Sequence, residues 1–171
     1  MLTRREAIEV LDREHAKVLE LVRRLPPEAR TRTGLGAGDW SPKDLLGHLE
    51  SWEEHALAAL EHWEQGEPPP IEAALAGEGV DGVNARTLTE KSGLPFDAVM
   101  RSFRDTHRAM MAKIRELSDE RWKTRALPTN RRAVATRLGS ILGGPGGPFR
   151  HAQAHLAELE AFVREHTGTR R

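Results

Sequence analysis

The sequence of 171 residues contains no cysteine. This absence excludes a disulfide framework, a thiolate metal site and a cysteine nucleophile within the chain. Any metal ion must therefore be bound through nitrogen and oxygen atoms. Any thiol chemistry must use a thiol that a small-molecule cofactor brings to the protein.

The chain also lacks an excess of charge and a long apolar run. Its 26 basic and 26 acidic side chains cancel, so no overall field favours a polyanionic partner or an anionic membrane surface. No apolar stretch approaches the roughly 20 residues that a membrane-spanning helix needs. Residues 1–10 are charged and helix-like, without the apolar core of a signal peptide. We therefore expect a cytoplasmic protein that binds neither nucleic acid nor membranes.

What the sequence does contain is amphipathic periodicity. Apolar side chains recur at three- and four-residue steps, and no segment shows convincingly the period of two that is typical of a half-buried strand. The long helices predicted from this pattern span residues 3–24, 42–64, 95–117 and 148–166. Short helical pieces are predicted at residues 83–91, 118–122 and 131–142, and a loop is predicted at residues 65–80.

These elements predict a single all-α domain that spans residues 1–171. A chain of this length is sufficient to bury a hydrophobic core, and four long amphipathic helices favour a four-helix bundle whose long connections carry the short extra helices. The best-defined helix start is Ser41, with Pro42 at the first helical position and Asp44 three residues after the cap.

Two of the eight histidines, His151 and His155, lie four residues apart in the last predicted helix. This spacing puts both imidazoles on one helical face, where they can bind one ion at Zn–N distances of about 2.0 to 2.1 Å. A chain with this many histidines often contains the spacing by chance, so the alternative of two ordinary helical histidines stays open.

A third ligand has to come from another helix, and His48 is the best candidate. It lies beside the apolar stripe of the second long helix, which includes Leu45, Leu49 and Trp52. The alternative is a histidine at the edge of the core, hydrogen-bonded to a carbonyl group. A site with three protein ligands leaves at least one coordination position open, which is typical of catalytic rather than structural metal sites.

Other polar residues have two competing interpretations. His107 lies in the apolar stripe of the third long helix, and it is a candidate rival ligand or a base for proton transfer near the site, with a histidine at the edge of the core as the alternative. Glu54 is a candidate for proton transfer, with an exposed acid as the alternative. Arg131 and Arg132 are candidates for collecting an anionic substrate, with a solvated face as the alternative. His15 lies among charged residues and is expected at the surface.

The segments DWSPKDLLGHLESWEEH, residues 39–55, and HAQAHLAEL, residues 151–159, resemble the DinB-like superfamily of four-helix-bundle proteins, which includes metalloenzymes. Residues 83–122 are similar to the middle of the branch that contains the ClbS and DfsB proteins. The resemblance implies a DinB-like topology and a facial triad of histidines that binds a divalent metal. His48, His151 and His155 occupy the three implied ligand positions.

The resemblance also implies a class of activity. Members with known activities include transferases and isomerases that use mycothiol or bacillithiol, and a resistance protein that hydrolyses a cyclopropane in a genotoxin. The implied function is a metal-dependent hydrolase or a thiol-dependent S-transferase, active in a stress response, that activates water or a cofactor thiol against a small molecule. The implied cofactors are a divalent transition metal (Zn, Ni, Fe or Mn) and a low-molecular-weight thiol.

Two other functions stay open. The protein could sequester a reactive compound or a metal without turnover, or the metal could be purely structural and tie the second helix to the last. Bundles of this kind often pair along their helices, so a homodimer is also considered.

The segment GGPGGP, residues 143–148, interrupts the approach to the last helix. It lacks the Gly-Lys-Ser/Thr ending of a phosphate loop, so we expect a hinge or rim loop rather than a nucleotide cradle. His151 then lies in the first turn of the helix, where the positive end of the helix dipole disfavours the imidazolium form and keeps the ring able to bind a metal.

Overall fold

The computed structural model describes residues 1–36 and 39–168. The regular elements in these ranges are all helical: α1 (Arg4–Arg24), the short 3₁₀ helix η1 (Pro27–Ala29), α2 (Pro42–Glu64), α3 (Pro70–Ser92), α4 (Phe96–Glu116), α5 (Asp119–Lys123), α6 (Val134–Ile141) and α7 (His151–Thr167). The all-α prediction is therefore confirmed. None of the helices in this part of the chain is long and apolar enough to cross a membrane.

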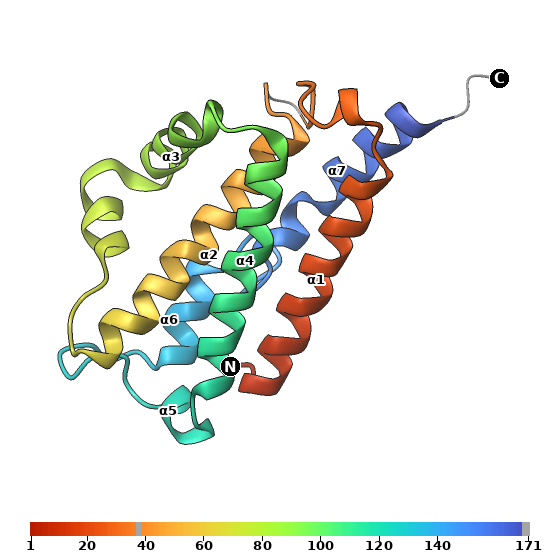
Figure 1. Cartoon of the computed structure of the whole chain (residues 1–171). Helices are drawn as coiled ribbons and strands as arrows, with labels where there is room; N and C mark the ends of the chain where they lie inside the picture. Colours follow the sequence, from red (N-terminus) through yellow and green to blue (C-terminus); the bar gives the residue numbers. More distant parts are fainter. Residues whose placement is uncertain (37–38, 169–171) are drawn as a thin grey trace.

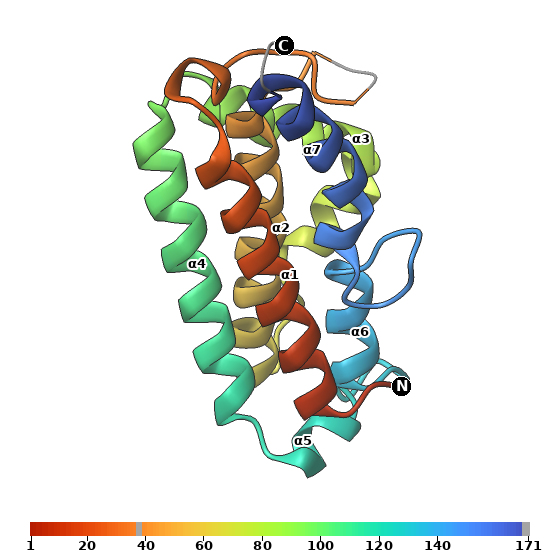
Figure 2. The ribbon, with the colours of Figure 1, turned by 90° about the vertical axis from the view of Figure 1, so that its right-hand side faces the viewer.

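Four helical columns form a bundle (Figure 1). Helices α1, α2 and α4 are three of them, and α6 and α7 follow one another end to end as the fourth (Figure 2). Helix α2 packs against α3, α4, α6 and α7, while α1 packs against α4 and α7. Helix α3 covers the side of α2 that faces away from α1 (Figure 1). The predicted four-helix bundle is present, with its fourth helix divided and an additional helix on the outside.

The start of α2 is fixed by a capping box at Ser41. The Ser41 Oγ accepts a hydrogen bond from the Asp44 N–H at 3.2 Å, and the Asp44 carboxylate accepts one from the Ser41 N–H at 2.9 Å. Because α2 begins at Pro42, His48 lies in its second turn, between the buried side chains of Leu45 and Leu49. The cap predicted from the sequence thus determines the position of one candidate ligand.

The loop predicted at residues 65–80 is helical from Pro70 onward, so this prediction was wrong. Helix α3 bends sharply at Gly79, whose φ of 68° and ψ of 178° lie outside the helical region. Its residues Ile71 and Val83 pack with Trp52 in a separate apolar cluster. The sequence misleads here because prolines and glycines dominate the segment, whereas a few contacts with α2 are enough to hold it in a helix.

The break between α6 and α7 is built around Phe149. This residue has a φ of 62°, unusual for a bulky side chain, and its ring is only 2 % exposed. The ring packs so close to α6 that a Cβ atom on Gly139 would lie 2.8 Å from it. The His151 N–H donates to the Leu142 carbonyl at 3.0 Å, which joins the start of α7 to the end of α6. Helix α7 thus begins at His151, three residues later than predicted, and the expected place of this histidine in the first turn is confirmed.

Candidate metal centre

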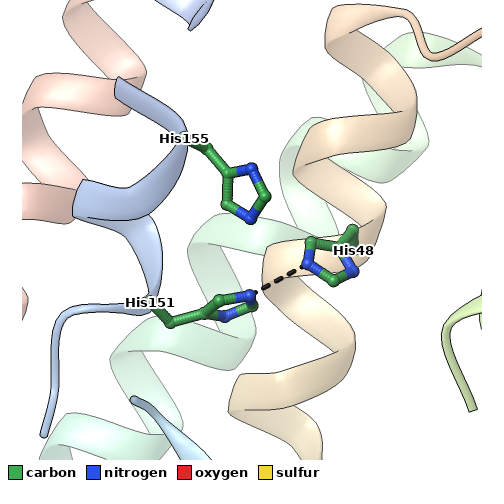
Figure 3. A group of neighbouring side chains, drawn as sticks. All are labelled: His48, His151 and His155. Atoms are coloured by element: carbon green, nitrogen blue, oxygen red, sulfur yellow. Dashed lines mark hydrogen bonds between the residues drawn. The ribbon is translucent and has the colours of Figure 1, made fainter. Parts of the chain in front are cut away.

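Three histidines from two helices converge: His48 of α2 with His151 and His155 of α7 (Figure 3). One ring nitrogen of each lies within 4.8 Å of the other two. The Nε2 atoms of His48 and His151 are 2.9 Å apart. The planes of each pair of rings make an angle of 74° to 83°, so the rings meet edge to face and are not stacked. The structure thus brings together the three residues that the sequence singled out as ligands.

Burial keeps these three rings in the neutral form. It lowers the pKa of His48 to about 3, with a further contribution from the neighbouring histidines. It lowers the pKa of His151 to about 4, again helped by His155. The pKa of His155 is also lowered by burial, against an opposing effect of the Glu158 carboxylate. Burial, more than the helix dipole invoked from the sequence, therefore leaves lone pairs available on the imidazoles at pH 7.

The start of α7 is held by a carboxylate from α1. The N-cap residue Arg150 offers no side-chain hydrogen bond to its own helix. Instead, the Glu14 carboxylate accepts a hydrogen bond from the Gln153 N–H at 3.1 Å and another from the Arg150 Nη1 at 2.8 Å. Glu14 is only 5 % exposed. Sequence reasoning missed this residue, although an acidic side chain on the apolar stripe of α1 was a usable signal.

An open cavity of about 470 Å³ gives access to the three histidines. Two indoles stand in its wall: the Trp40 ring lies 4.8 Å from the His48 ring, and the Trp52 ring lies 6.0 Å from the His151 ring. The Trp52 Nε1 donates to the Asn84 Oδ1 at 3.0 Å, which fixes the indole to α3. Residues 143–145 form another part of the wall, as expected for a rim loop. A small molecule can therefore reach the histidines from solvent.

A second group of polar side chains lies deeper in the bundle. His107 of α4 contacts Glu53 through Nδ1 at 2.8 Å and Asp12 through Nε2 at 3.2 Å. His15 stacks on His107, with ring centroids 3.7 Å apart and an interplanar angle of 10°. An imidazole lone pair lies in the plane of its ring, so the lone pairs of two nearly parallel stacked rings lie in separate planes and do not converge on one ion as those of the three candidate ligands do. We interpret this group as a hydrogen-bonded cluster rather than a second metal site.

The two histidines of this second group have pKa values that are shifted in opposite directions. Burial lowers the pKa of His107, but the hydrogen bonds and charges of Glu53 and Asp12 outweigh it, and the net pKa is raised. Burial lowers the pKa of His15 to about 3, and the neighbouring His107 contributes further. His107 is thus favoured as an imidazolium and His15 as a neutral ring. The predicted surface position of His15 was wrong, because the charged residues around it in the sequence point elsewhere on α1.

A small, partly enclosed cavity lies between this cluster and the candidate metal centre. Its volume of about 20 Å³ is enough for roughly one water molecule. His15, Glu53 and His151 all line it. The Nδ1 of His15 and the Oε2 of Glu53 are buried and have no hydrogen-bond partner among the described residues. Both unpartnered atoms belong to the cluster of His15, Glu53 and His107.

The two residues predicted for proton transfer do not line the open cavity. The Glu54 side chain is 49 % exposed and pairs with the Lys91 Nζ at 3.0 Å. His107 belongs to the cluster behind the site. Arg131 and Arg132 are exposed on the connection between α5 and α6 and also lie outside the cavity wall. The structure therefore brings none of these four side chains to the three histidines.

Comparison with known proteins places this geometry in a family. Residues 11–139 match the mycothiol maleylpyruvate isomerase N-terminal domain, a range that includes His48 but ends before α7. No curated protein is similar enough in sequence to count as a relative.

Two solved structures share the fold. One is an uncharacterised protein from Escherichia coli UTI89, 15% identical, with a TM-score of 0.77 over 96% of this chain and 95% of that chain. The other is the colibactin self-resistance protein ClbS, determined in complex with double-stranded DNA, 10% identical, with a TM-score of 0.63 over 96% of this chain and 94% of that chain. The bound DNA is a property of that protein, since likeness at this identity shows the fold alone. The chain belongs to the mycothiol maleylpyruvate isomerase N-terminal domain family, within the DinB-like superfamily.

Proposed function

We propose that this protein is an enzyme that binds a divalent transition metal ion through His48, His151 and His155 and acts on a small molecule. The observation that carries the proposal is the convergence of three neutral imidazoles on the wall of an open cavity. Acidic or basic clusters at a protein surface are common without a ligand. Largely buried, uncharged imidazole nitrogens that face one another are instead typical of a transition-metal site.

The donor set fits such an ion. At metal–nitrogen distances of about 2.0 to 2.1 Å, the ligand atoms of a tetrahedral site lie about 3.4 Å apart. The separation of 2.9 Å between two Nε2 atoms and the outer limit of 4.8 Å for the group bracket this value. Imidazole suits Zn, Ni and Fe better than Mn, which prefers oxygen ligands. When bound, such an ion would lower the pKa of a water molecule or a thiol in its coordination sphere.

The residues of the chain contribute binding, orientation and exclusion of water. Helix α7 presents two imidazoles one turn apart, and Glu14 holds the first turn of that helix in place. Trp40 and Trp52 cover the approach with apolar surface, which excludes bulk water from the reacting groups. Because the chain has no cysteine, a reactive thiol has to be part of a cofactor, and the reference to mycothiol in the family name supports this choice. Hydrolysis or thiol transfer is the reaction class we propose.

Two alternatives differ in what the metal does. In a structural site, a fourth protein ligand closes the coordination sphere, but no fourth histidine or carboxylate joins the three histidines among the residues described. This argues for an open site. A protein that sequesters a reactive compound would bind it at the same place without turnover, so only a kinetic measurement separates it from an enzyme.

The first test is elemental analysis of protein purified without a histidine tag. We expect about one equivalent of a transition metal after reconstitution. Less than about a tenth of an equivalent would contradict the proposal. His155→Ala should abolish binding while circular dichroism shows unchanged helical content. His166→Ala is the matched control, because this residue lies on the same helix outside the cavity and should retain the metal. Binding that survives in His155→Ala would place the metal elsewhere.

A further inference from the structure

We infer that the cavity over the three histidines selects a molecule with a flat apolar body that is neutral or cationic, and that it rejects polyanions. The inference rests on the proposed function, because it names the substrate class of the same site. It departs from the family name, which refers to maleylpyruvate, a dicarboxylate at neutral pH. The reasons lie in the cavity wall and in the pairing of the charges around it.

The wall of the cavity is mainly apolar and partly aromatic. The Trp40 ring lies 4.8 Å from the His48 ring and 6.4 Å from the His155 ring, while Trp52 stands beside His151. Apolar side chains from α3, α6 and the rim loop complete it: Val80, Ile141 and Pro145. Indole faces favour flat apolar groups and cations, because the ring quadrupole presents negative charge above and below the plane. A flat apolar body in this cavity therefore gains contacts with the wall that an extended, charged acid does not.

Charge in the wall has the wrong sign for an anion. Glu158 is the one charged side chain among the described lining residues other than the histidines, and no lysine or arginine is found there. Recognition of a dicarboxylate normally uses arginine, which forms two parallel hydrogen bonds to a carboxylate. Without such a partner, a carboxylate that leaves water for this cavity loses hydration and gains no charged hydrogen-bond donor from the wall in return.

Four basic side chains on the surrounding elements are already paired with carboxylates. Arg86 of α3 pairs with Glu78 and Glu90, and Lys91 of the same helix pairs with Glu50 and Glu54. On the other side, Arg137 of α6 pairs with Glu72, and Arg150 pairs with Glu14. These four cations would have to leave carboxylate partners in order to turn toward an anionic substrate. Apart from a bound metal ion, an anion in the cavity therefore meets no cation among the described lining residues.

Two aromatic thiols, one without and one with carboxylates, test the selectivity. 4-Methylbenzenethiol and 5-sulfanylisophthalate share an aromatic thiol, but the second carries two carboxylates. Both are titrated into the cobalt(II) form of the protein, where the thiolate-to-cobalt absorption in the near ultraviolet reports binding without any turnover. We expect the methyl compound to bind at least tenfold more tightly. Equal or tighter binding of the dicarboxylate would overturn the inference.

Charge reversal in the wall provides the matched variants. Glu158→Arg should reduce the preference for the neutral thiol at least tenfold, because it places a cation in the cavity. Glu165→Arg makes the same change of charge further along α7, outside the cavity, and should leave the preference as it is. An equal effect of both variants would show that the overall charge, and not the cavity wall, determines selectivity. If Glu158→Arg fails to fold, Glu158→Gln is expected to shift the preference in the same direction, by less, and no shift would contradict the inference.

Failure of the two proposals can be told apart. A protein that takes up no cobalt contradicts the proposed metal site. A protein that binds cobalt at the three histidines but prefers the dicarboxylate retains the metal site and loses the inferred substrate class.

Discussion

Histidine takes two opposite roles in this bundle, and the neighbours of each ring decide which. The ring nitrogens of His107 face the carboxylates of Glu53 and Asp12, which favour a charged ring. His48 and His151 face each other through their Nε2 atoms in a buried place, which favours neutral rings. The same side chain thus acts as a cation in one group and as a donor of lone pairs in the other.

The charged state of His107 depends on Glu53, and substitution tests this. Glu53→Gln should lower the pKa of His107, because it removes the carboxylate next to Nδ1. It should also lower the free energy of unfolding by about 1 to 3 kcal/mol, since a charged hydrogen bond in a largely buried place is lost. NMR titration of the His107 ring protons and denaturant unfolding give the two quantities.

The adjacent acid is the control for this substitution. Glu54→Gln should leave both quantities close to wild type, because Glu54 is half exposed and pairs with Lys91. An unchanged pKa of His107 in Glu53→Gln would contradict the assignment. A loss of turnover in Glu54→Gln, with stability intact, would support the proton-transfer role predicted from the sequence.

At the level of elements, local sequence patterns are sufficient for some features and not for others. The cap at Ser41 and the four-residue spacing of His151 and His155 are local, so the second turn of α2 and the histidine face of α7 could be predicted. The contact of Glu14 with α7 joins residues far apart in the chain, and it depends on how α1 packs against α7. No single-segment pattern contains that information.

The errors in the prediction also arise from contacts between segments that are far apart in the chain. Residues 70–80 were expected in a loop because prolines and glycines disfavour helices locally, but Ile71 packs on Trp52 and stabilises the helix from outside. The cluster of His15, Glu53 and His107 collects one residue from each of three helices. Its members could be recognised singly as polar residues near apolar stripes, but their meeting is a result of packing.

The position of α7 depends on Glu14. Glu14→Ala removes the acceptor of the Gln153 N–H and the partner of Arg150, so the first turn of α7 should fray. We expect metal affinity to fall at least tenfold in a chelator competition, with increased hydrogen exchange at residues 151–155. Glu14→Gln keeps an acceptor oxygen, so its metal affinity should lie between those of the alanine variant and wild type.

An acid elsewhere on α1 controls for a general effect on that helix. Glu20 is exposed near Lys17, and Glu20→Ala should keep wild-type metal affinity. If Glu14→Ala loses thermal stability but binds the metal as tightly as wild type, Glu14 supports the fold only and does not position the histidines.

For the whole molecule, buried neutral histidines make stability depend on acidity. The pKa of His15, His48 and His151 lies near 3 to 4 in the folded protein, against 6.5 for the solvent-exposed side chain. Between these values the unfolded chain binds protons that the folded chain does not. Their stabilising contribution is therefore complete above about pH 6.5 and is lost progressively as the pH falls toward the folded values. His107 acts in the opposite sense, since its raised pKa favours the folded state below its unfolded pKa.

Removal of one buried histidine should weaken this dependence in the metal-free protein. His15→Gln is expected to give a shallower fall in the free energy of unfolding between about pH 6.5 and pH 4 than wild type. Urea unfolding at several pH values gives the slope of the free energy of unfolding against pH. A loss of packing that is the same at every pH does not change this slope. A slope in His15→Gln as steep as that of wild type would contradict the prediction.

His151 lines both the open cavity and the small, partly enclosed space of about 20 Å³ behind it. Glu53 lines the same small space. From Glu53, hydrogen bonds continue through His107 to Asp12, whose side chain is 46 % exposed. One imidazole thus adjoins both the solvent-facing cavity and a chain of polar side chains that ends at a half-exposed carboxylate on another part of the bundle.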